Sequence, residues 1–304
     1  TNTTNAPITA TITVTPSYTN GGTTCTGTPT SFTITVNPTA TVNTVANQTV
    51  CKGSSTSAVT FSSPTTGGTV TYAWTNSNTA IGLAASGTGN IATFVATNTT
   101  NAPITATITV TPTYNNGSAT CTGTPTSFTI TVNPILNASV SIAASATTVC
   151  ASTSVTFTAT PTNGGTAPIY QWKVNGANVG TNSATYTSTT LANSDVVTVV
   201  MTSNATPCLA GSPATSNSVT MTVNALPATP TISGTLFTYK GATTQLTGSP
   251  AGGSWTSSQP AVATVDASGL VSGLTAGTIT VTYTITNASG CSSSTTASVT
   301  IYAA

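Results

Sequence analysis

Few side chains in this sequence could take part in acid–base chemistry. The 304 residues include three lysines and two aspartates but no arginine, glutamate or histidine; the charged residues are Lys52, Lys173, Lys240, Asp195 and Asp266. General acid–base catalysis needs a titratable side chain near the reacting group, and a serine or cysteine nucleophile needs a base within hydrogen-bond reach. We therefore predict that the protein is not an enzyme and that it has no catalytic residues.

The same scarcity of charge argues against metal and nucleic-acid sites. Calcium sites use several carboxylate and carbonyl oxygens, and zinc sites use clusters of Cys, His or acidic ligands. Neutralising a phosphate backbone needs clustered Lys and Arg, whereas the three lysines here are scattered. We expect no metal, no cofactor and no nucleic-acid partner.

Six cysteines are the most informative reactive side chains. They occupy an early position, after a Thr-Val pair, at Cys51 and Cys150, and a late position at Cys25, Cys121, Cys208 and Cys291. The chain shows neither a signal-peptide pattern nor an apolar run long enough to cross a membrane, so we interpret it as a mature or excised extracellular segment. Cysteines in an extracellular chain indicate disulfides, and their pairing depends on the elements that carry them.

An internal repeat defines those elements. Residues 1–38 recur at 97–134 without gaps, and the copies differ only at Ser17/Thr113, Thr19/Asn115, Gly22/Ser118 and Thr23/Ala119. The period of 96 residues is too long for a solenoid unit and suits an autonomous domain. The chain therefore reads as a piece of a tandem array that opens inside a repeat.

Strand patterns run throughout the sequence. In residues 102–112, apolar residues alternate with threonines, and residues 277–286 repeat this alternation. A period of two is typical of half-buried antiparallel strands, and no comparable helical period occurs. We predict an all-β chain with very little helix.

A recurring terminal strand marks the domain boundaries. SFTITVNP ends at Pro38 and at Pro134, SVTMTVNA ends at Ala225, and SVTIY lies near the end of the chain. We predict part of a repeat at 1–38 and complete domains at 39–134, 135–225 and 226–304. Domains of this size with short strands and Gly, Asn and Pro turns are typical of immunoglobulin-like antiparallel β-sandwiches. Very short linkers favour a head-to-tail rod.

Two disulfide schemes fit these domains. Pairing within domains joins Cys51 to Cys121 and Cys150 to Cys208, which leaves Cys25 and Cys291 alone. Pairing between domains joins Cys51 to Cys208 and Cys150 to Cys291, so that only Cys25 and Cys121 lack partners in this sequence. The loop order of an immunoglobulin-type sandwich favours the second scheme, and the frequency of intradomain disulfides in small domains favours the first. In the last domain Tyr239 occupies the early position.

Aromatic residues suggest a core and a small surface. Trp74, Trp172 and Trp255 each follow the first third of a domain, where immunoglobulin-like folds place a core tryptophan. Tyr18 and Tyr114 lie beside the variable loop of the repeat, and they are our candidates for an exposed contact, for example with a surface glycan.

Several segments resemble known families. TVCKGSSTSAVTF, TYAWTNSN and CTGTPTSFTITVNP look like the PKD-like and immunoglobulin-like repeats of very large Bacteroidota surface proteins, including gliding-motility adhesins exported by type IX secretion. SSQPAVATVDASGLVSGLTAGTITVTYT is similar to the bacterial immunoglobulin-like group 2 (BIG2) module of intimin- and invasin-type adhesins. These resemblances imply display at the bacterial cell surface and a role in adhesion.

Three functional hypotheses follow. The first is a non-enzymatic adhesin or filament segment whose domains act as rigid spacers, with neighbouring repeats as partners. The second is a self-assembling fibre subunit in which strands from another copy of the chain complete residues 1–38. The third is a carbohydrate-binding module. The sequence names no ligand, no number of further repeats and no assembly state.

Overall fold

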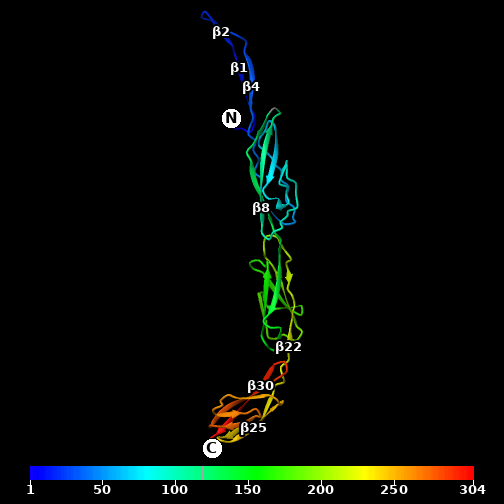
Figure 1. The fold of residues 1–304 in the computed structure, drawn as a ribbon, viewed down its shortest axis with the longest axis vertical. Coiled ribbons are helices and arrows are strands. Elements are labelled where there is room, and N and C mark those ends of the chain that lie inside the picture. The colour runs from blue at the N-terminus through cyan, green and yellow to red at the C-terminus, as the bar shows by residue number, and fades with distance from the viewer. Residues whose placement is uncertain (118) are drawn as a thin grey trace. The chain divides into compact units, whose positions relative to one another are not determined.

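Strands make up nearly all the regular structure of the chain. The computed structural model describes residues 1–117 and 119–304, so Ser118 lies outside the described residues (Figure 1). In this described part there is no α-helix, and a short 3-10 turn, η1, spans Thr79–Ile81. Two compact units are present: Thr1–Asn137 with Ala205–Ala210, and Ala138–Asn204 with Gly211–Ala304. The prediction of an all-β fold is confirmed.

The first unit contains one large sheet. Its strands are β5 (Gln48–Cys51), β10 (Thr126–Asn133), β8 (Ile104–Asn115), β6 (Thr69–Asn76) and β7 (Ser86–Thr88), in that order, and β9 (Thr120–Thr122) pairs with the end of β8. All of the pairs are antiparallel except β5 with β10. Buried and less buried residues alternate along β8, as the sequence predicts.

A second layer of mostly irregular chain covers this sheet. The segments on either side of β6 and β7 contain two isolated bridges, Ser55 with Val95 and Val59 with Ile91. Their apolar side chains pack onto the sheet, and the shared core includes Phe61, Trp74, Ile81, Ile91, Ile108 and Phe128. The cover therefore comes from residues 39–96, and the central strands come from residues 104–133.

Residues 1–38 form the same hairpin without a cover. β1 (Ile8–Val14) pairs with β4 (Thr30–Val36), and β2 (Ser17–Asn20) pairs with β3 (Thr23–Thr26). The β1–β4 register matches that of β8 with β10, and the threonine pairs on one face recur: Thr9 with Thr35 and Thr105 with Thr131 both lie within hydrogen-bond distance. Among the residues that the structure describes, no further strand pairs with this hairpin (Figure 1).

The second unit begins with a two-sheet arrangement. One sheet contains β12 (Ser139–Ala144), β14 (Val155–Thr162) and β17 (Thr185–Ser188). The other contains β16 (Ala177–Val179), β15 (Ile169–Val174), β18 (Val196–Thr202), β20 (Ala214–Thr215) and β21 (Val219–Thr220). Trp172 is fully buried here and lies against Phe157 and Tyr186, with its indole N–H donating to the Ser183 carbonyl at 2.9 Å.

The same unit ends with a sandwich of two four-stranded sheets. One runs β23 (Thr231–Gly234), β25 (Thr243–Ser249), β28 (Leu270–Gly273), β27 (Ala263–Val265), and the other runs β24 (Phe237–Tyr239), β30 (Ser292–Tyr302), β29 (Gly277–Thr286), β26 (Ser254–Ser257). Tyr283 lies over Gly248 and Gly253, where a Cβ would come within 2.6 Å of the ring. Its hydroxyl donates to the Pro250 carbonyl at 2.7 Å, which fixes the ring in this place.

One pairing recurs three times. A short strand near the start of each predicted domain pairs in parallel with that domain's last strand: β5 with β10, β13 (Thr148–Cys150) with β22 (Thr222–Asn224), and β24 with β30. In register, Cys51 faces Asn133, Cys150 faces Asn224 and Tyr239 faces Tyr302. These three positions are therefore structurally equivalent, as the sequence alignment of the early position implies.

Candidate functional site

The first disulfide joins Cys51 to Cys208. Cys51 ends β5 beside Asn133, whose carbonyl accepts the Lys52 N–H at 2.9 Å. Cys208 lies just before β19 (Leu209–Ala210), which pairs in parallel with β11 (Leu136–Asn137), and its carbonyl accepts the Leu136 N–H at 2.9 Å. The bond thus lies where the last strand of residues 39–134 leads into the following segment.

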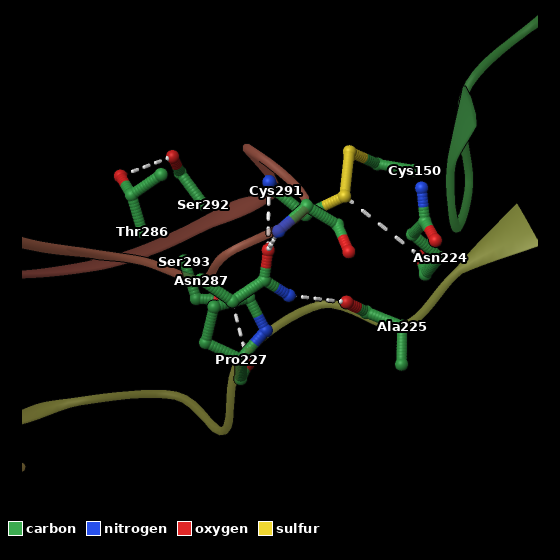
Figure 2. The surroundings of a disulfide bond; sticks show 10 residues. Cys150, Asn224, Ala225, Pro227, Thr286, Asn287, Cys291, Ser292 and Ser293 are labelled. Carbon is green, nitrogen blue, oxygen red and sulfur yellow. Dashed lines mark hydrogen bonds between the residues drawn. A yellow bond between two sulfur atoms is a disulfide. The ribbon is translucent and has the colours of Figure 1, made fainter. Parts of the chain in front are cut away.

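The second disulfide joins Cys150 to Cys291 in a similar setting (Figure 2). Cys150 ends β13 beside Asn224, whose carbonyl accepts the Ala151 N–H at 2.9 Å. Cys291 is 1% exposed, and its N–H donates to the Asn287 side chain at 3.0 Å. The Asn287 amide in turn donates to the Ala225 carbonyl at 2.9 Å.

Both disulfides share one geometry. The early cysteine ends a short strand that pairs in parallel with the last strand of its own predicted domain, beside an asparagine. The late cysteine belongs to the next predicted domain, in a loop that contacts the linker directly after that last strand. The Ser293 hydroxyl donates to the Pro227 carbonyl at 2.8 Å, two residues past Ala225, just as β19 contacts Leu136, two residues past Pro134. These are the pairs of the second of the two schemes that the sequence left open, in which cysteines of successive predicted domains are joined.

Cys25 and Cys121 form no disulfide among the described residues. Cys25 is exposed on β3, opposite Tyr18, and Cys121 is partly buried on β9, opposite Tyr114. Near Cys121, the Asn116 side chain donates to the Asn37 side chain, and the Thr124 N–H donates to the Ala40 carbonyl at 3.3 Å. Cys121 therefore also lies in a loop that contacts a linker.

The prediction of an exposed contact at Tyr114 is wrong. Tyr114 is fully buried, whereas Tyr18 at the same position of the other copy is 69% exposed. The Tyr114 ring packs directly on Gly68, where a Cβ would lie 2.6 Å from the ring, and the Gly67 position lies against Pro7. The Gly67-Gly68 pair is the sequence signal for this close approach, and our sequence interpretation missed it.

The core role of the tryptophans is largely confirmed. Trp74 and Trp172 are buried, and Trp255 is half-buried against the last core and lies 4.4 Å from the Tyr283 ring centre. Burial also raises the pKa of the Tyr72 and Tyr170 hydroxyls above the ordinary value. These aromatic residues stabilise the cores.

Both aspartates serve turns. The Asp266 carboxylate accepts the Ser268 hydroxyl at 2.7 Å and the Ser268 and Leu270 N–H groups at 2.9 Å, and these bonds, the hydroxyl first, lower the pKa of Asp266. Asp195 accepts from the Asn175 amide at 2.7 Å and from the Ala192 N–H at 2.8 Å. The described residues contain no group of three His, Cys, Asp or Glu side chains that could hold a metal.

An exposed aromatic cluster was not predicted. Phe237, Tyr239 and Tyr302 are each about half exposed, and their ring centres lie 5.8 to 6.5 Å apart. Tyr239 and Tyr302 occupy the positions that Cys51 and Asn133 hold earlier in the chain. Residues 226–304 thus have aromatic rings at the position where Cys51 and Cys150 form disulfides earlier in the chain.

Comparisons with known proteins agree with an immunoglobulin-like fold. The family model of the intimin immunoglobulin-like domain matches residues 240–289. No curated protein matches the chain. No helix in the described residues is long and apolar enough to span a membrane.

Several solved structures are similar to the chain at low identity. Protocadherin gamma B2 extracellular cadherin domains 1–5 are 14% identical with a TM-score of 0.41, over 98% of this chain and 66% of that chain, just under two thirds of its length. A 1.5-MDa bacterial ice-binding adhesin is 14% identical with a TM-score of 0.42, over 88% of this chain and 100% of that chain. Mouse cadherin-23 EC22–24 is 16% identical with a TM-score of 0.40, over 88% of this chain and 99% of that chain. Scores below 0.5 do not establish a shared fold. The family match, together with the all-β fold, supports an immunoglobulin-like repeat of adhesin type.

Proposed function

We propose that the chain is a non-enzymatic structural segment of a secreted or cell-surface adhesin or filament. In this proposal the domains at 39–134, 135–225 and 226–304 are rigid spacers, and residues 1–38 are the C-terminal part of another repeat. The resemblance of the repeats to giant Bacteroidota surface proteins supports bacterial surface display. The family match to an intimin domain at residues 240–289 supports a role in adhesion.

The observation that carries this proposal is the pair of disulfides Cys51–Cys208 and Cys150–Cys291. Each joins cysteines of two successive predicted domains, so the links would hold neighbouring domains together under tension. Links between successive domains suit a load-bearing stalk, because they hold the domains together when the chain is pulled. The aspartates support the same function, because their carboxylates are engaged by turn groups.

Mechanical unfolding of single molecules tests the proposal. The shortest covalent path through the oxidised chain runs from residue 1 to 51, crosses to 208, returns to 150, crosses to 291 and ends at 304. This path has about 120 residues and an extended length of about 440 Å, against about 1090 Å for the reduced chain. Pairing within domains, Cys51 with Cys121 and Cys150 with Cys208, leaves a path of about 175 residues, or about 630 Å. A fully extended length near 630 Å or 1090 Å for the oxidised chain contradicts the proposal.

A self-assembling fibre is the second candidate function. The uncovered β1–β4 hairpin favours it, because a strand from another chain could complete an exposed sheet. Sedimentation over a wide concentration range tests it: a fibre subunit forms growing oligomers, and a spacer stays monomeric. A glycan contact now rests on Tyr18 alone, and binding to a glycan array that is lost on Tyr18→Ala would support it.

A further inference from the structure

Two nearly identical hairpins differ sharply in exposure. In β8 and β10 the inward apolar residues are 0 to 3% exposed: Ile108, Val110, Phe128, Ile130 and Val132. Their counterparts in β1 and β4 are 38 to 54% exposed: Ile12, Val14, Phe32, Ile34 and Val36. Since the sequences of the strands are the same, the difference comes from what covers them.

The cover of the second hairpin is known from this structure. It is the segment 39–96, which adds β5 to the edge of β10 and β6 to the edge of β8, and places Phe61, Ile81 and Ile91 on the apolar face. An identical apolar face and identical strand edges at β1–β4 fit a segment of the same kind. The segment 39–96 of a second folded copy is not available for this, because it is already paired with that copy's own β8 and β10.

At the first junction, between residues 1–38 and 39–134, the loop that contains Cys121 already contacts its linker. At the two disulfides, the loop of the late cysteine contacts a residue two positions past the end of the terminal strand motif: Leu136 after Pro134, and Pro227 after Ala225. At the first junction the Thr124 N–H contacts Ala40, two positions after Pro38. Cys121 therefore lies in the same relation to its linker as the two bonded late cysteines do to theirs.

The other side of this junction lacks its strand. Cys51 and Cys150 lie beside Asn133 and Asn224, and the equivalent residue of the first hairpin is Asn37, beside which the described residues place no strand. Asn37 itself accepts a hydrogen bond from Asn116 in the β8–β9 turn.

The start of the hairpin shows how a covering segment connects. Asn98 lies two residues after the covering segment, and its amide donates to the Ala102 and Val132 carbonyls at 2.8 and 2.9 Å. Asn2 makes the same bonds to the Ala6 and Val36 carbonyls at 2.7 and 2.8 Å. Residues 1–6 thus already have the conformation that follows a covering segment.

We infer that β1–β4 and Cys121 form a docking site for an additional segment of the 39–96 type, joined ahead of Thr1 in a longer chain, whose cysteine lies beside Asn37 and forms a disulfide with Cys121. This inference rests on the proposed function, because it extends the same link to one more repeat. The two thiols lose two protons and two electrons, which the disulfide of a thiol–disulfide oxidoreductase accepts as it is reduced to two thiols.

A chain with residues 39–96 duplicated ahead of Thr1 tests the inference. Non-reducing peptide mapping should join the added copy of Cys51 to Cys121. Hydrogen exchange of the β1 and β4 amides should slow by roughly tenfold or more relative to the 304-residue chain. Cys121→Ser should abolish the new link and keep most of this protection, and Cys25→Ser should keep both, because Cys25 lies in the loop of the preceding junction.

Other outcomes overturn the inference. An added cysteine that pairs with Cys25, or that stays free beside a free Cys121, removes the link. A separate 39–96 peptide that links to Cys121 as completely as the fused segment, at equal concentration, removes the tandem placement and favours exchange between chains. The same map reports on the proposed function: loss of Cys51–Cys208 and Cys150–Cys291 contradicts that proposal, whereas their presence beside an unlinked Cys121 contradicts this inference alone.

Discussion

Tyr18 and Tyr114 occupy the same position in two hairpins of nearly identical sequence, yet Tyr18 is 69% exposed and Tyr114 is fully buried. The residue type is the same in both places, although the flanking residues differ: Ser17 and Thr19 in one copy, Thr113 and Asn115 in the other. The burial of Tyr114 comes from its cover, since Gly68 and the segment around it lie over the ring. Matching positions of the two hairpins can therefore serve as controls for each other. The next two predictions compare Tyr114 with Tyr18 and Gly123 with Gly27.

Truncating the buried tyrosine should destabilise the first unit. Tyr114→Ala removes a fully buried ring, and losses of large buried aromatic side chains cost about 3 to 5 kcal/mol. Tyr18→Ala removes an exposed ring and should change stability by less than about 0.5 kcal/mol. Hydrogen exchange of β8 and β10 amides in increasing urea measures both variants. Equal effects of the two substitutions would contradict the assigned burial.

A methyl group at Gly123 should disturb the first junction. A Cβ there would overlap the Ala40 carbonyl and lie 2.7 Å from the Pro112 side chain, whereas a Cβ at Gly27 would meet only Pro16, at 2.9 Å. Gly123→Ala should therefore cost about 1 to 3 kcal/mol more than Gly27→Ala. Exchange at the Thr124 N–H, which donates to Ala40, should accelerate only in Gly123→Ala. An unchanged Thr124 amide in that variant argues against the contact with the linker.

Strand positions and core tryptophans followed from the sequence, whereas the outcome for Tyr114 did not. Alternation of apolar and threonine residues determines which face of β8 is buried, because side chains of a strand alternate between two faces. It does not determine which segment covers that face, since covering contacts join residues far apart in sequence. The cysteine pairs were predicted only in part. Their positions in the sequence limited the pairing to two schemes, and the choice between the schemes needed the structure, which places each linker beside the loop of a late cysteine.

Acid should weaken the last domain through Asp266. Its pKa is lowered in the folded state from 3.8, chiefly by the Ser268 hydroxyl and the Leu270 N–H. A depressed carboxyl pKa contributes stability above the unfolded value, and this stability is lost as the pH falls below about 4 and through the folded pKa. Asp266→Asn should flatten the pH dependence of β25 and β28 exchange below about pH 4. An identical acid response in wild type and variant would falsify this role.

Removing one disulfide should loosen its junction and leave the cores intact. The double variant Cys51→Ser with Cys208→Ser frees the β11–β19 contact from a cross-link that spans a sequence separation of 157 residues. Cross-links that close long loops restrict open states by a few kcal/mol, typically about 2 to 4. The Leu136 N–H, which donates to the Cys208 carbonyl, should therefore exchange about tenfold faster or more. The Ile108 and Ile130 amides in the core strands should keep their rates, because the side chains of those residues pack within 39–134.

Cys25→Ser with Cys121→Ser is the matched control, since it removes two thiols and no bond. If the control loosens Leu136 as much as the double variant does, thiol loss rather than the cross-link explains the change.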